Sequence, residues 1–303
     1  MTLPIEVEHL RLSYGSTTAL DDVSFALPGG RIYGLLGRNG SGKTSLLSVL
    51  AGFRRAEAGA ARIDGLPVFE NPAVTSRVCL IRETADAAHA DESIKDTLQM
   101  AADLRPGWDA DYAAALLDRF GIVVKSKVGA LSRGQRSAFG ITIGLASRTP
   151  VTMYDESHLG MDAPTRSVFQ EELLRDFTEH PRTIIISTHL IEEMSALFEE
   201  VLILDRGRLL VREDAETLRS RGASVTGPAD AVDRFVDFGG FTRLGERQLG
   251  HTKSAMVYGE IDDVHRQQAR EAGLELGPVD LQNLFTHLTE PNTGQRSILG
   301  GIR

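Results

Sequence analysis

The chain has 303 residues, of which 42% are hydrophobic and 25% charged, a composition typical of a soluble globular protein with one large or two modest domains. Its formal net charge of -9 argues against non-specific nucleic-acid binding, which needs a basic face, so we expect no nucleic-acid partner. The single cysteine, Cys79, excludes an internal disulfide, and the longest apolar runs fall far short of the roughly 20 residues of a membrane span.

The first part of the chain predicts strands on both sides of a glycine-rich loop. Alternating or short apolar stretches with Gly, Pro and Asp turn signals indicate the strands, and a helix begins directly after the loop. The predicted strands cover residues 5–15, 17–27, 31–37, 59–68 and 77–83, and the predicted helix covers residues 43–53.

A helical segment then interrupts this pattern. Residues 91–104 and 109–122 carry apolar residues at helical spacing, and another helix follows "LSRGQ" at residues 131–135. Because strands and helices alternate again afterwards, we expect an α/β core with a parallel sheet and short, buried central strands. The predicted elements are strands at 151–156 and 182–188, helices at 163–180 and 190–198, and a hairpin at 200–210.

The pattern changes again after about residue 221. The remainder predicts the order β-α-β-β-α-β, which is the split βαβ arrangement of a small second domain. The strands are expected at 224–226, 242–249, 253–258 and 274–279, and the helices at 229–238 and 262–272. The alternative is a loose tail of helices packed on the first domain. The expected domains are residues 1–221, with a helical subdomain at about 84–150, and residues 222–303.

The loop "GRNGSGKT", Gly37 to Thr44, matches the phosphate-binding pattern G-x-x-x-x-G-K-[ST] between a predicted strand and a predicted helix. Gly40 and Gly42 let the chain curl so that N–H groups point at phosphate oxygens, and the helix N-terminus favours the negative charge. Lys43 is expected to reach the β- and γ-phosphates of ATP, and the Thr44 hydroxyl to bind Mg²⁺.

Two further strand ends carry candidate catalytic groups. "VTMYDE" ends in Asp155 and Glu156, where the first acid would lie beside the metal and the second would activate the attacking water. An ordinary surface pair of acids is the alternative. "IIISTHL" carries His189 after a buried strand, which would aim the imidazole at the γ-phosphate and the attacking water.

Together these motifs resemble those of the ATP-binding-cassette (ABC) ATPases. The phosphate loop, "LSRGQ", the "DE" pair, "LGMD" and "STH" follow one another in that family's order over residues from about 5 to 220. The resemblance is nearest to the ATPase subunits of bacterial ABC-2-type exporters, whose tails "LQNLFTHLT" also resembles. The expected fold is α/β, a P-loop NTPase ABC-ATPase core with an antiparallel β subdomain and a helical subdomain, plus the small C-terminal α+β domain.

The resemblance implies a role for the "LSRGQ" helix at a second copy of the protein. In this family two cassettes face each other head-to-tail, and Ser132 and the Gly134 N–H of one would contact the γ-phosphate held by the other. Asp162 would lie at the dimer seam, and Tyr14 would stack on adenine or else belong to the core. The residues expected at the nucleotide are Tyr14, Gly37, Arg38, Asn39, Gly40, Ser41, Gly42, Lys43, Thr44, Ser45, Ser132, Gly134, Gln135 and Asp162.

Several positions depart from the family's usual pattern. Arg133 replaces a glycine of the signature, where its guanidinium would contact phosphate, a partner acid or only solvent. Glu83 aligns best with the usual glutamine and is expected to reach Mg²⁺ together with Thr44 and Asp155, although Arg82 is the other candidate for facing the metal. Ser157 replaces a proline, and its loss is expected to loosen the placement of Glu156. His158 and Leu159 also differ, without a functional account.

The expected function is an ATP-binding and ATP-hydrolysing subunit, with Mg²⁺, that dimerises with a second copy or a related cassette and powers a separate polytopic membrane permease, an exporter. Its location would be cytoplasmic, peripheral on the inner face of the cell membrane. The alternative is a soluble regulatory ATPase of ABC type that is not coupled to transport. A cassette acting on nucleic-acid or ribosomal machinery is disfavoured by the single phosphate loop and the acidic charge.

Overall fold

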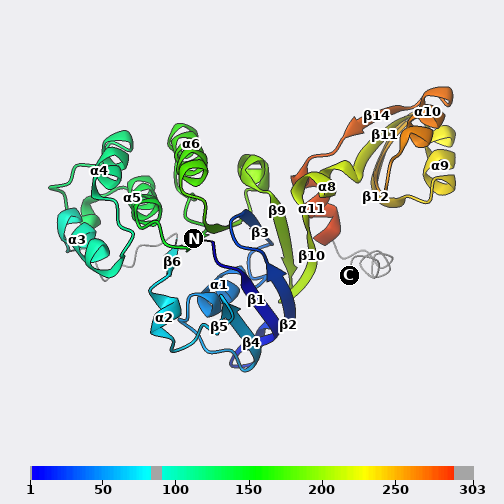
Figure 1. The fold of residues 1–303 in the computed structure, drawn as a ribbon. Coiled ribbons are helices and arrows are strands. Elements are labelled where there is room, and N and C mark those ends of the chain that lie inside the picture. The colour runs from blue at the N-terminus through cyan, green and yellow to red at the C-terminus, as the bar shows by residue number, and fades with distance from the viewer. Residues whose placement is uncertain (1, 83–90, 290–303) are drawn as a thin grey trace. The chain divides into compact units, whose positions relative to one another are not determined.

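The computed structural model describes residues 2–82 and 91–289, and the chain divides into two compact units (Figure 1). The first unit contains the chain up to His189 together with the segment Leu204–Leu209. The second contains Leu190–Ile203 and the chain from Leu210 onward. Among the described residues, no helix is both long and apolar enough to cross a bilayer.

The N-terminal part of the first unit contains an antiparallel sheet with the strand order β2-β1-β4-β5. Ile5, Val7 and Leu12 of β1 are buried between neighbours that are exposed or partly exposed, because a strand with one face on the core turns alternate side chains inward. The strands are β1 (Ile5–Tyr14), β2 (Thr17–Leu27), β4 (Ala58–Ile63) and β5 (Leu66–Pro67). The predicted antiparallel β subdomain is therefore confirmed.

A parallel sheet forms the core of the first unit, where its strand order is β3-β8-β7-β6. Every residue of β3, β7 and β8 is buried, which explains their almost continuous apolar sequences. The strands are β3 (Ile32–Leu36), β6 (Val78–Arg82), β7 (Val151–Asp155) and β8 (Thr183–Thr188). Parallel strands have their carboxyl ends at the same edge of a sheet. The phosphate loop after β3, the acidic pair at the end of β7 and His189 after β8 therefore lie at one edge.

Most helices of the first unit begin after a residue whose side chain caps the first turn. Ser93, Asp109 and Ser132 each accept a hydrogen bond from a backbone N–H three residues later. The helices of the first unit are α1 (Lys43–Leu50), α2 (Pro72–Thr75), α3 (Ile94–Leu104), α4 (Ala110–Arg119), α5 (Arg133–Ala146) and α6 (Ala163–Glu179), with a 3₁₀ turn η2 at Val128–Ala130. Of these, α3 to α5 form the predicted helical subdomain.

Buried charges join the helical subdomain to α6. Glu172 of α6 is fully buried and pairs with Arg119 of α4, and the Tyr112 hydroxyl lies 3.1 Å from its Oε2. Burial raises the pKa of Tyr112 to about 12, so its hydroxyl stays protonated and donates. One turn further, Asp176 Oδ2 lies 2.6 Å from the buried Arg182 guanidinium. These carboxylates are stable inside the protein because each has a cationic partner.

The second unit contains the predicted split βαβ arrangement. Its four strands form an antiparallel sheet with the order β12-β13-β11-β14. These elements are β11 (Gly222–Pro228), α9 (Ala229–Phe238), β12 (Thr242–Leu249), β13 (Thr252–Tyr258), α10 (Asp263–Glu271), β14 (Glu275–Pro278) and α11 (Leu281–Thr289). Before them the chain forms α7 (Ile191–Met194), η3 (Ser195–Leu197), β9 (Glu200–Asp205), β10 (Arg208–Asp214) and α8 (Ala215–Ser220).

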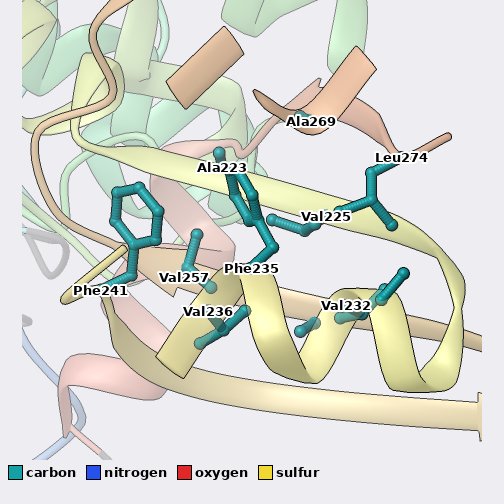
Figure 2. Close-up of a cluster of buried hydrophobic side chains, with 11 residues drawn as sticks. Ala223, Val225, Val232, Phe235, Val236, Phe241, Val257, Ala269 and Leu274 are labelled. Atoms are coloured by element: carbon teal, nitrogen blue, oxygen red, sulfur yellow. The ribbon is translucent and has the colours of Figure 1, made fainter. Parts of the chain in front are cut away.

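This sheet has a hydrophobic core of its own (Figure 2). Val232 and Phe235 of α9 pack with Val225 of β11 and Val257 of β13, and the Phe235 ring stacks on Phe241 with centroids 5.4 Å apart. The order of elements, the antiparallel sheet and this core confirm a small α+β domain rather than a loose tail of helices.

Candidate active site

The phosphate loop joins the end of β3 to the start of α1. Its backbone is left-handed at Gly40 (φ 79°) and Gly42 (φ 106°), a conformation that glycine adopts without a steric penalty. A Cβ atom at Gly42 would lie 2.5 Å from the carbonyl oxygen of Ala19, so the close approach also requires glycine. The loop ends where α1 begins, and a helix N-terminus with its N–H groups and dipole favours an anion.

Lys43, the first residue of α1, is buried and held across the loop. Its Nζ donates to the carbonyl oxygens of Gly37 at 2.7 Å and Arg38 at 3.3 Å. The same Nζ lies 3.2 Å from Oε1 of Glu156. The lysine charge is therefore directed to the point where the phosphate loop meets the end of β7.

The acidic pair after β7 divides between two environments. Asp155 is buried and accepts a hydrogen bond of 2.9 Å from the hydroxyl of Ser187 on β8. Glu156 has a left-handed backbone (φ 53°), and its Oε2 lies 3.0 Å from Nδ1 of His189. Glu156 thus contacts Lys43 with one carboxylate oxygen and His189 with the other, so the three residues predicted to be catalytic lie together.

A cavity of about 560 Å³ opens over this cluster. Most of the predicted phosphate-loop residues line it, whereas Gly37 and Arg38 do not and instead anchor Lys43 through their carbonyl groups. The lining residues are Tyr14, Thr17, Thr18, Ala19, Asn39, Gly40, Ser41, Gly42, Lys43, Thr44, Ser45, Glu156, Leu159 and His189. Thr17, Thr18, Ala19 and Leu159 were not expected at the site from the sequence. The first three begin β2, directly after the short turn that follows Tyr14, and this closeness to Tyr14 is the signal that could have found them.

Tyr14 ends β1 at the rim of this cavity and does not belong to the buried core. Its side chain is 44% exposed, and the guanidinium of Arg54 lies 5.6 Å from the ring centroid. An exposed aromatic ring backed by a cation offers a flat face for a planar group such as a nucleobase.

Thr44 and Asp155 carry oxygen atoms of the kind that Mg²⁺ binds, and Mg²⁺ prefers a few such ligands completed by phosphate oxygens and water. Thr44 lines the cavity, whereas Asp155, which directly precedes Glu156, is buried and is not among the lining residues. Residues 2–82 and 91–289 contain no cluster of three or more His, Cys, Asp or Glu that would hold a metal alone. Glu83, the third predicted ligand, lies outside the described residues, and its neighbour Arg82 donates to the hydroxyl of Ser48 on α1 at 2.9 Å.

The "LSRGQ" residues are not among those that line the cavity of their own chain. Ser132 and Gln135 form a capping box, in which each side chain accepts a hydrogen bond from the other residue's backbone N–H. A Cβ atom at Gly134 would lie 2.8 Å from the carbonyl oxygen of Gly160, so α5 begins directly against the turn after β7. Asp162 caps α6 by accepting from the Thr165 N–H at 2.9 Å.

Two of the residues that differ from the usual family pattern, Arg133 and Ser157, have defined contacts. The side chain of Arg133 lies along Gly160, where its Cγ and Cδ would be 2.9 and 3.0 Å from an added Cβ. Ser157 is fully buried, and its hydroxyl donates to the carbonyl oxygen of Ile81 on β6 at 2.8 Å. Where a proline ring would stiffen this turn, the hydroxyl of Ser157 ties it to the neighbouring strand.

Comparison with known proteins gives a consistent result. A sequence model described as "ABC transporter" matches residues 20–158. The doxorubicin resistance ATP-binding protein DrrA of Mycobacterium tuberculosis is 30% identical over 232 residues, which cover 74% of this chain and 69% of that protein. The Nod factor export ATP-binding protein I of Burkholderia thailandensis is 27% identical over 304 residues, which cover 94% of this chain and 97% of that protein.

Solved structures share the fold. The structure of an ATP-binding subunit of an ABC transporter aligns with a TM-score of 0.64 at 24% identity, over 71% of this chain and 91% of that one.

Proposed function

Because the chain belongs to the family of ABC transporter ATP-binding proteins, we propose that it hydrolyses ATP to power an exporter. The observation that carries this proposal is the position of Glu156 at the cavity wall, between Lys43 Nζ at 3.2 Å and His189 Nδ1 at 3.0 Å. A carboxylate placed between a phosphate-binding lysine and an imidazole can accept the proton of an attacking water molecule beside the phosphate.

Each residue of the cluster has a separate task in this proposal. The N–H groups of the phosphate loop and the Nζ of Lys43 bind β- and γ-phosphate oxygens. Glu156 orients the attacking water and takes its proton, and His189 holds that carboxylate through Nδ1 while it hydrogen-bonds the γ-phosphate. Mg²⁺, held by Thr44 and Asp155, would neutralise phosphate charge.

We also propose that a second cassette completes the site. Ser132, Gly134 and Gln135 begin α5, whose N-terminus favours an anion, yet these residues do not line the cavity of their own chain. Their positions suit a nucleotide that is bound by a second copy or a related cassette in a head-to-tail, two-fold dimer. Asp162 would then lie at the seam, and Tyr14 would stack on the adenine of its own chain.

The membrane partner is the last part of the proposal. Relatives of this chain carry names of export and resistance proteins, and moving a molecule across a bilayer requires a spanning protein. We propose a separate polytopic permease as that partner, with this chain peripheral on the cytoplasmic face of the membrane. The cycle then couples ATP-driven closing of the cassette dimer, and its opening after hydrolysis, to the permease.

The Glu156→Gln variant tests the proposal. Glutamine keeps the shape of the side chain but removes the base, so we expect turnover of ATP to fall by about 10²–10⁴-fold while ATP binding is retained. Since hydrolysis opens the dimer, the variant should also sediment as a dimer in the presence of ATP. The control is Glu271→Gln, which changes an exposed glutamate of α10. Wild-type turnover in Glu156→Gln would refute the assignment of the base.

A further inference from the structure

The turn after β7 carries a histidine that the proposed mechanism does not use. His158 is fully buried, and its Nε2 lies 2.8 Å from Oγ1 of Thr188, the last residue of β8. Thr188 is itself fully buried and directly precedes His189. One hydrogen bond therefore joins the turn that follows Glu156 to the residue next to the histidine of the site.

The imidazole of His158 is uncharged at neutral pH. Burial lowers its pKa to about 4, and the nearby Arg166 and His189 act in the same direction. A neutral imidazole and a threonine hydroxyl can each donate or accept, so they form a hydrogen bond in either sense. In the described part of the chain, Nδ1 of His158 has no hydrogen-bond partner.

Three consecutive residues tie this turn to three different elements. The Ser157 hydroxyl donates to Ile81 of β6 at 2.8 Å, and the Leu159 carbonyl accepts from Ser137 of α5 at 2.9 Å. Between them, His158 bonds to the end of β8. Of these three hydrogen bonds, the one from His158 reaches Thr188, the residue directly before His189.

We infer that His158 is a positioning residue that holds His189 in place for ATP hydrolysis, an inference that rests on the proposed function. The His189 side chain is 36% exposed and that of Glu156 only 13%, so packing restrains the histidine less. Its contact with Glu156 therefore depends on where the end of β8 is held. Loss of the bond from His158 should slow the hydrolytic step more than nucleotide binding, because binding depends on the phosphate loop, a separate segment.

The test removes the bond from either side. His158→Leu and Thr188→Val each delete one partner and keep a similar volume, whereas His158→Gln keeps an amide nitrogen in place of Nε2. We expect kcat to fall about tenfold in each deletion variant, KM for ATP to stay within about twofold, and the glutamine variant to recover most of the loss. The double variant His158→Leu/Thr188→Val should be no slower than the slower single variant, because both remove the same bond.

A matched control separates positioning from stability. Thr152 lies at the other end of β7, is fully buried, and shares a 3.1 Å hydrogen bond with the Thr149 hydroxyl. Thr152→Val should lower the melting temperature without changing kcat. Unchanged kcat in His158→Leu and Thr188→Val, multiplying effects in the double variant, or an equal loss in Thr152→Val would each overturn the inference.

Two further outcomes are also decisive. If His158→Leu does not fold, the kcat of Thr188→Val is compared with that of Thr188→Ser, because serine keeps the hydroxyl. Equal kcat values in these two variants overturn the inference. A wild-type protein that does not hydrolyse ATP would overturn the proposed function itself, and this inference with it.

Discussion

Replacing Gly134 by alanine should separate the start of α5 from the turn after β7. The added Cβ would lie 2.8 Å from the Gly160 carbonyl oxygen, whereas ordinary contact begins at 3.4 Å, so the two backbones must move apart by about 0.6 Å. A displacement of this size at a catalytic contact costs on the order of 10- to 100-fold in rate. Overpacking against backbone should also cost about 1–3 kcal/mol of stability.

The assay is the ATP turnover of purified protein, read beside its thermal unfolding. Gly140→Ala is the control on the same helix, because its Cβ would meet only the Ile81 side chain at 3.1 Å, which can shift. We expect turnover to fall in Gly134→Ala and to stay near wild type in Gly140→Ala. Wild-type turnover in Gly134→Ala, or equal losses in both variants, would refute the reasoning that α5 contributes its N-terminus to an ATP site.

Two further predictions concern stability. Asp176→Ala leaves the buried guanidinium of Arg182, 3% exposed, without its carboxylate, and should lower the free energy of unfolding in urea by about 3–5 kcal/mol. Glu8→Ala breaks the exposed ion pair with Arg62 and should cost less than about 1 kcal/mol, so equal losses would contradict the argument. In acid, the unfolded chain protonates His158 with an ordinary pKa near 6.5, while the folded chain does so only near pH 4. Protonation of His158 in the unfolded chain should therefore lower the free energy of unfolding by about 2 kcal/mol between pH 7 and pH 5. The His158→Gln variant should lose less stability than wild type over that interval. Identical losses would contradict the low pKa assigned to His158.

Much of the fold could be predicted because its signals are local. The apolar strands of the parallel sheet, the glycine-rich loop, and the second-unit order from β11 to β14 each follow from short patterns. The sequence patterns do not predict α2 (Pro72–Thr75) and α8 (Ala215–Ser220), which have four and six residues. Helices this short contain too few residues to show a helical spacing of apolar side chains. Their only sequence signals are the N-cap residues Asn71 and Asp214.

The site could be predicted in its members but not in its contacts. The motifs placed Lys43, Glu156 and His189 at one edge of a sheet, yet the sequence does not contain the distances that join the carboxylate to both the lysine and the histidine. The effect of Ser157 illustrates the same limit. Its hydroxyl donates to the carbonyl oxygen of Ile81, which is 76 residues away in the sequence. This hydrogen bond, which holds the turn where the family has a proline, can be recognised only once β6 is known to pair with β7.

The register of the parallel sheet also has a consequence for how the protein is made. β3, which leads into the phosphate loop, pairs with β8, so that Ile32 lies opposite Ile184 and Leu36 opposite Thr188. A ribosome must therefore synthesise the chain as far as Thr188 before the strand that carries the phosphate loop gains this neighbour. The antiparallel pair β1 and β2, joined by a short turn, can form much earlier, because closing a short loop costs less entropy than closing a long one. The ATP site is thus assembled late in synthesis, and a ribosome that stops before β8 releases a chain in which the phosphate loop lacks the strand beside it.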